Sequence, residues 1–140
     1  MKLNNIFIKI PTIVLGLHAL INFFRGGAHF FLPDGGSTVI ADLDIGSGDQ
    51  KQIIITIFAV MGAGQIIWGA LQCYILFYAK KMTAVILAFT TASVGMGMFV
   101  LYIFKPLPIT VPGHSNIYIL IVLVIATIIA YRNQSMKDYP

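Results

Sequence analysis

The sequence contains very little charge. Only 10% of its 140 residues are Asp, Glu, Lys or Arg, and glutamate is absent altogether. Hydrophobic residues make up 58% of the chain, and the mean hydropathy is +0.88. Such a chain has too little polar surface to coat a soluble domain of its size. This scarcity of charge excludes an ordinary soluble protein and predicts residence in a lipid bilayer.

Chemically reactive residues are equally scarce. Cys73 is the only cysteine, so an intramolecular disulfide is excluded. All five acidic residues are aspartates that fall outside the long apolar runs, so no intramembrane carboxylate pair is available for acid–base catalysis. The net charge of +4 is not gathered into a basic surface, which argues against nucleic-acid binding. An enzyme is therefore not favoured, and the residues indicate no particular cofactor.

The sequence does contain four long apolar runs. Each is close to the ~20 residues that a helix needs to cross ~30 Å of hydrocarbon. We therefore predict an all-α fold, a four-transmembrane-helix up-down bundle in one integral-membrane domain spanning residues 1–140. A loop with three prolines, residues 105–116, is expected to join the last two helices as an ordered cap. The predicted spans are residues 11–31, 53–79, 83–104 and 115–131.

Basic residues are distributed unevenly between the two sides of this bundle. If the N-terminus is cytoplasmic, the outer segments hold only Lys51 and Lys105. Inner segments rich in Lys and Arg are the usual pattern of inner-membrane proteins, so both termini are predicted to be cytoplasmic. The inner segments hold Lys2, Lys9, Lys80, Lys81, Arg132 and Lys137.

A secretory signal is the alternative interpretation of the first apolar run. Two lysines precede the run, and residues 26–28, Gly-Gly-Ala, resemble a cleavage site of small residues. However, His18, Asn22 and Arg25 are poor choices for the apolar core of a signal. The sequence therefore favours a retained transmembrane helix.

Polar residues gather on one stripe of the first span. At ~100° per residue, His18, Asn22, Arg25 and His29 lie on the same face of a helix. Polar groups at bilayer depth normally face the bundle interior or a water-filled cavity. The simpler interpretation is that these side chains bond to neighbouring helices and that Arg25 reaches toward the interface. The alternative is a binding pocket.

The second span offers a matching polar face. Gln65, Trp68 and Gln72 recur at helical spacing, so two amides and one indole donor share one side. Counting along antiparallel helices places His18 and Gln65 at the same depth, and we expect a hydrogen bond between them. The candidate ligand-binding residues are thus His18, Asn22, Arg25, Gln65, Trp68 and Gln72.

A metal site is a further hypothesis. His29, His114 and either Asp34 or Asp42 are all expected at the outer side, where they could converge on one ion. No close ligand spacing supports such a site, so no metal is predicted.

The order of motifs resembles that of DoxX-like membrane proteins. A basic start is followed by GGAHFFLPDGG at the end of the first span, by GAGQIIWG in the second, and by a proline-rich last loop. The resemblance implies a small four-helix protein of the bacterial inner membrane, in a family some of whose members are linked to quinone-dependent oxidoreductase complexes. It gives no residue a catalytic role, and the redox cysteine motif that would support electron transfer is missing.

Three functions are compatible with these patterns. The leading hypothesis is a binding or accessory protein whose polar face accepts a lipid-like, quinone-like or small anionic ligand, with Arg25 as the charge partner. The second is a small transporter or channel subunit in which the stripe lines a path. The third is a structural, self-associating protein. The expected partners are the bilayer, such a ligand, and either further copies of the chain or a larger membrane complex.

Overall fold

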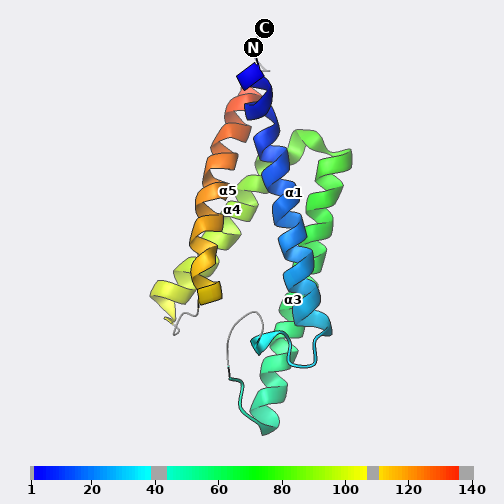
Figure 1. Cartoon of the computed structure of the whole chain (residues 1–140), viewed down its shortest axis with the longest axis vertical. Helices are drawn as coiled ribbons and strands as arrows, with labels where there is room; N and C mark the ends of the chain where they lie inside the picture. Colours follow the sequence, from blue (N-terminus) through cyan, green and yellow to red (C-terminus); the bar gives the residue numbers. More distant parts are fainter. Residues whose placement is uncertain (1, 39–43, 107–110, 136–140) are drawn as a thin grey trace. The chain divides into compact units, whose positions relative to one another are not determined.

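The described part of the chain forms four long helices (Figure 1). The computed structural model describes residues 2–38, 44–106 and 111–135, with side chains from residue 9 and, in the last range, from residue 115. No strand occurs in these ranges, which confirms the all-α prediction. The long helices are α1 (Lys2–Phe31), α3 (Gly48–Tyr78), α4 (Thr83–Phe99) and α5 (Val111–Ser135). Two short segments extend them, the 3₁₀ turn η1 (Lys80–Met82) and the π-helical segment η2 (Val100–Phe104).

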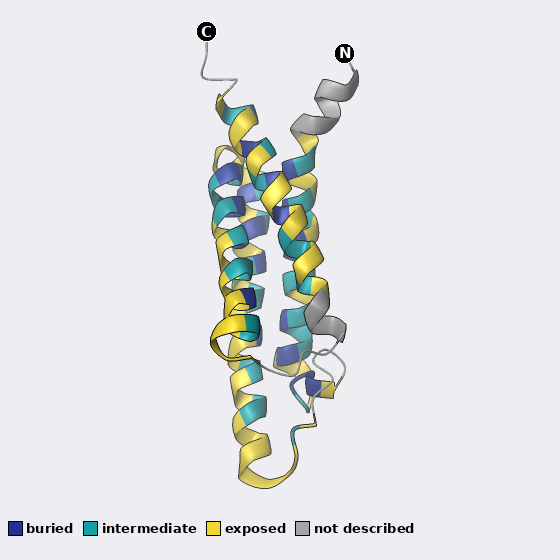
Figure 2. Ribbon diagram, turned by 90° about the vertical axis from the view of Figure 1, so that its left-hand side faces the viewer, coloured by how far each residue is buried: buried dark blue, intermediate teal, exposed yellow. Residues whose placement is uncertain are grey.

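Each long helix supplies a segment that can cross a membrane. The segments are Lys9–Phe31, Gly48–Tyr78, Lys80–Phe104 and Ser115–Ser135, long and apolar enough to span hydrocarbon. Large apolar side chains are exposed along all of them, as expected where lipid replaces water. Figure 2 shows exposed residues in every long helix. These properties are those of a multi-pass membrane protein.

Three helices begin earlier than the spans predicted from hydropathy. The α1 helix starts at Lys2, before the predicted first residue, Pro11. The α3 helix starts at Gly48, so its polar first turns are already helical before the apolar run. The α5 helix starts at Val111, and the second half of the proline-rich segment therefore belongs to a helix rather than to a cap. Pro112 is compatible with this because the first turn of a helix leaves its N–H groups unbonded in any case.

The chain divides into two compact units, with the boundary inside α1 and α3. One, which we call the terminal unit, comprises the residues up to Leu17 and those from Tyr74 onward. The other, which we call the hairpin unit, comprises His18–Cys73. The hairpin unit contains all six predicted ligand-binding residues.

In the terminal unit, α4 packs against α5. Leu87 and Leu123 are almost completely buried, and Ala126 is 0% exposed, so small and branched side chains form the contact. The hydroxyls of Thr91 and Thr127 lie 2.9 Å apart across it. Each hydroxyl also bonds to a carbonyl of its own helix, which satisfies its polar group within the apolar surroundings.

The π-helical end of α4 has a local cause. Lys105 N–H donates to the carbonyl of Val100 at 2.8 Å, a bond that spans five residues instead of four. Pro106 follows, and proline disfavours α conformation in the residue before it. The helix therefore widens and ends at this point.

Candidate functional site

Two glycines set the packing of α1 against α3 in the hairpin unit. A Cβ atom on Gly26 would lie 2.8 Å from the carbonyl oxygen of Gly62, and one on Gly62 would lie 2.6 Å from the carbonyl oxygen of Gly26. Both distances are too short for any side chain, so the two backbones are in direct contact. Gly69 continues this line of close contact between α1 and α3, which we call the seam. A Cβ on Gly69 would lie 3.2 Å from the carbonyl oxygen of Ala19. Glycine at these positions lets the antiparallel helices approach closely.

A polar cluster occupies one end of this seam. His18, Asn22 and Gln72 bond to one another inside the hairpin unit, and His18 and Gln72 are buried. Asn22 Nδ2 donates to Gln72 Oε1 at 3.0 Å and lies 3.1 Å from His18 Nδ1. Gln72 Nε2 and Oε1 lie 3.1 and 3.3 Å from the same ring nitrogen. His18 Nδ1 therefore meets an amide donor and an amide acceptor of one side chain, so the cluster accommodates either tautomer of the ring.

The predicted bond between His18 and Gln65 is wrong, because the partner on α3 is Gln72. The count along the helices assumed that the second span begins level with the end of the first. Instead, α3 begins at Gly48 and its first turns extend beyond Phe31, which shifts the pairing by two helical turns. Gln65 lies against Gly26, whose Cβ would be 3.0 Å from that of Gln65.

His29 fastens the loop that follows α1. Its Nδ1–H donates to the carbonyl oxygen of Gly35 at 2.7 Å, and its ring stacks on Phe58 with centroids 5.2 Å apart. Gly35 has a φ of 63°, a conformation that favours glycine, and its backbone packs against Phe58. The ring is 3% exposed, so His29 belongs to the packing between α1, the loop and α3.

The metal hypothesis gains no support from this part of the molecule. Within the described residues, no three His, Cys, Asp or Glu side chains lie close enough to hold a metal ion. One ring nitrogen of His29 is used by Gly35, and the carboxylate of Asp34 caps the turn that follows it. Asp42 and the side chain of His114 lie outside the described residues.

The other three predicted residues are half-buried. Arg25 adjoins Gly26 in α1, and Gln65 lies opposite that glycine on α3. Trp68 follows Gln65 by one helical turn, so both belong to one stretch of α3. The Oε1 atom of Gln65 is buried and accepts no hydrogen bond from the described part of the chain. Buried acceptors are rarely left in this state in folded proteins.

Sequence reasoning missed the residues that position this site. Gly26 and Gly62 set the helix contact, and Gly35 and Phe58 hold His29. One signal was available in the sequence. Gly62 and Gly69 are seven residues, or two helical turns, apart, so both glycines lie on the same face of α3 and leave it without side chains at two levels.

The chain matches no family model, no curated protein and no solved structure.

Proposed function

We propose that this chain is a small membrane protein that binds an amphipathic ligand, a lipid or a quinone, at the Arg25, Gln65 and Trp68 face of the hairpin unit. The observation that carries the proposal is the buried Oε1 atom of Gln65, which accepts no hydrogen bond from the described residues. A headgroup hydroxyl would satisfy it. An apolar tail would lie among the exposed aliphatic side chains of α3, such as Ile67.

Arg25 supplies the second part of such a site. The guanidinium is a fork of five donors that matches a carboxylate, a phosphate or a pair of carbonyl oxygens. Its position beside Gly26 brings it to the level of Gln65 across the seam. A headgroup that combines a hydroxyl with an anionic or carbonyl oxygen would therefore find an acceptor in Gln65 and a donor in Arg25, with Trp68 as an apolar wall.

A structural role is the second candidate, and the polar cluster favours it. His18, Asn22 and Gln72 bond to one another, so half of the six predicted residues already serve the packing of α1 on α3. Hydrogen bonds between helices are a common means of holding membrane helices together. On this interpretation the cluster fixes the register and the protein acts by associating with itself or with a larger complex.

We also propose the membrane in which the protein resides and the side on which its termini lie. The unequal distribution of Lys and Arg favours cytoplasmic termini, and the order of motifs favours a DoxX-like protein of the bacterial inner membrane. Cysteine labelling of substituted positions in intact cells tests the orientation. Positions 47 and 113 should react from outside and position 135 only from inside, whereas labelling of position 135 from outside would reverse the topology.

Ligand retention tests the binding proposal against the structural one. Arg25→Lys keeps the charge and removes the planar fork, and Gln65→Leu removes the acceptor. Mass spectrometry of molecules that co-purify with each variant should show a ligand that wild type retains and both variants lose. Gln52→Leu is the matched control because Gln52 is exposed near the start of the same helix. If all four proteins carry identical species in equal amounts, the binding proposal fails and the structural role remains.

A further inference from the structure

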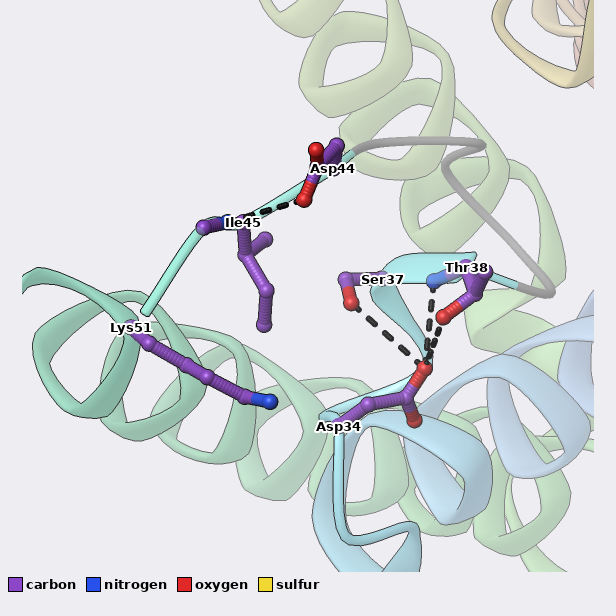
Figure 3. A pocket seen from close by; sticks show the side chains of 7 residues that line it. Asp34, Ser37, Thr38, Asp44, Ile45 and Lys51 are labelled. Carbon is purple, nitrogen blue, oxygen red and sulfur yellow. Dashed lines mark hydrogen bonds between the residues drawn. The ribbon is translucent and has the colours of Figure 1, made fainter. Parts of the chain in front are cut away.

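A second candidate site lies at the end of the hairpin unit opposite the polar cluster, where the loop after α1 meets the start of α3. A cavity of about 440 Å³ opens between three segments there (Figure 3). This volume is in the range of small-molecule sites. Its walls are Asp34, Ser37, Thr38, Asp44, Ile45, Gly46 and Lys51.

One wall of the cavity is held rigidly by Asp34. Its carboxylate accepts hydrogen bonds from the N–H groups of Gly36 and Thr38 at 2.9 and 3.2 Å, and also from the Thr38 hydroxyl. The Ser37 hydroxyl donates to it as well, at 3.5 Å (Figure 3). The bonds from Thr38 and Gly36 lower the pKa of Asp34 to about 2, so this wall stays ionised. Because both oxygens are engaged, Asp34 shapes the cavity and has little capacity left for a ligand.

Two other charged groups are better placed to bind. The side chain of Lys51 extends toward the 34–38 segment, and no hydrogen bond joins its ammonium to the other labelled residues (Figure 3). One oxygen of Asp44 accepts from the N–H of Gly46 at 2.9 Å, which leaves its second oxygen for a ligand. Ile45 lies next to Asp44 and offers an apolar surface between the two charges.

The depth of the cavity indicates where the ligand comes from. Lys51 precedes by two residues the apolar run that begins at Ile53, and the first turns of α3 before it are polar. At ~1.5 Å per residue, the ammonium therefore belongs at the boundary between hydrocarbon and water, where lipid headgroups lie.

The balance of charge selects among the possible ligands. A bare anion would face two carboxylates and only one ammonium, so repulsion would outweigh attraction. A metal cation would be repelled by Lys51, and both oxygens of Asp34 already accept hydrogen bonds. A zwitterion with a phosphate and a primary ammonium satisfies both sides: the phosphate accepts from Lys51 and the ammonium donates to Asp44. We propose that this cavity binds a phosphoethanolamine group, and that its source is the headgroup of a phospholipid. This site is separate from the Arg25, Gln65 and Trp68 face and does not depend on the function proposed for that face.

Lipid titration of the purified full-length protein, followed by native mass spectrometry, tests this proposal. The lipids are phosphatidylethanolamine, phosphatidylcholine and phosphatidylglycerol with identical acyl chains. Phosphatidylethanolamine should bind best, because the choline headgroup has no N–H to donate to Asp44 and the glycerol headgroup has no cation. Asp44→Asn should weaken this preference about two- to fivefold, the range expected for exposed charge pairs, because Asp44 is the partner of the ammonium. Lys51→Gln should weaken the binding of all three lipids by a similar factor, because each of them carries the phosphate.

Matched controls separate recognition from general effects of charge. Asp49→Asn removes an exposed carboxylate from the first turn of α3, and Lys105→Gln removes an exposed lysine from the end of η2; neither residue lines the cavity. Both controls should bind like wild type. Soluble phosphoethanolamine provides the last arm: weaker binding than that of the lipid supports a membrane source, and equal binding assigns the same site to a free ester.

Two results would overturn the proposal. One is equal binding of the three lipids to the wild-type protein. The other is stronger binding of Ca²⁺ after Lys51→Gln with no change toward phosphatidylethanolamine, which would make the cavity a cation site from which the lysine repels the ion.

Discussion

Replacing Gly62 with alanine should separate α1 from α3. A Cβ at this position would lie 2.6 Å from the carbonyl oxygen of Gly26 and 2.8 Å from the amide nitrogen of Phe30. Ordinary contact begins at 3.4 Å, so the backbones have to move apart by up to about 0.8 Å. Both opposing atoms belong to the backbone of α1, and no side chain can turn aside to make room.

The polar cluster makes this displacement costly. Overpacking of this kind costs about 1–3 kcal/mol by itself. His18 Nδ1 lies 3.1 and 3.3 Å from the two amide atoms of Gln72, so the same movement takes these bonds to the limit of useful length. Each bond between membrane helices contributes roughly 0.6 kcal/mol on average. We therefore expect Gly62→Ala to lie in the upper half of the overpacking range.

Reversible unfolding in mixed micelles measures the effect. Trp68 is the only tryptophan of the chain and lies on the same helix, so its fluorescence reports on the hairpin unit. Gly64→Ala is the control, because a Cβ at Gly64 meets nothing within 4 Å. Alanine there should be neutral or should stabilise the helix by up to about 1 kcal/mol. If Gly62→Ala and Gly64→Ala unfold alike, the close approach of the two helices is not a property of the folded protein.

Three further predictions concern the remaining polar contacts. Replacing His18 and Gln72 by apolar residues, singly and together, should give a coupling of about 0.6–1.7 kcal/mol in a double-mutant cycle of unfolding free energies, and additivity would show that the pair is not bonded. The same cycle on Thr91 and Thr127 should give a smaller coupling, since each hydroxyl keeps its bond to its own helix. Asp34 has a depressed pKa of about 2, so its contribution to stability is complete above pH ~4 and is lost as the pH falls toward 2. Thermal unfolding between pH 5 and 2 should therefore show a smaller loss of stability for Asp34→Asn than for wild type, and equal losses would contradict the capping role.

Much of the architecture could be predicted from hydropathy and spacing. Four apolar runs of the right length indicate four helices, and helical periodicity alone places His18 and Asn22 on one face of α1. The structure confirms that these two side chains meet polar groups of α3. The prediction succeeds here because it concerns single helices, in which the geometry is the same for every sequence.

The register between the helices could not be predicted in the same way. It depends on where the two backbones come closest, and this place is determined by Gly26 and Gly62. A hydropathy profile does not mark such a contact, because glycine is neither strongly apolar nor strongly polar. It also depends on how far α3 extends past the end of α1. The first turns of α3 are polar, so the apolar run does not reveal that the helix begins before it. An error of two turns was enough to replace Gln72 by Gln65 as the partner of His18.

The register also explains the order of the contacts along the seam. The glycine contact lies between the His18 and Gln72 pair and the stacked rings of His29 and Phe58, so the closest approach of the helices is flanked by a polar pair on one side and by an aromatic stack on the other. In lipid, apolar contact provides little preference for one register over another, because the tails are as apolar as the side chains. A slip of either helix by one turn would leave the buried amide and imidazole groups without partners, which is expensive in hydrocarbon. The polar residues that seem out of place in this chain are therefore needed to fix one alignment, and only the alignment that they fix brings Arg25 and Gln65 to the same level.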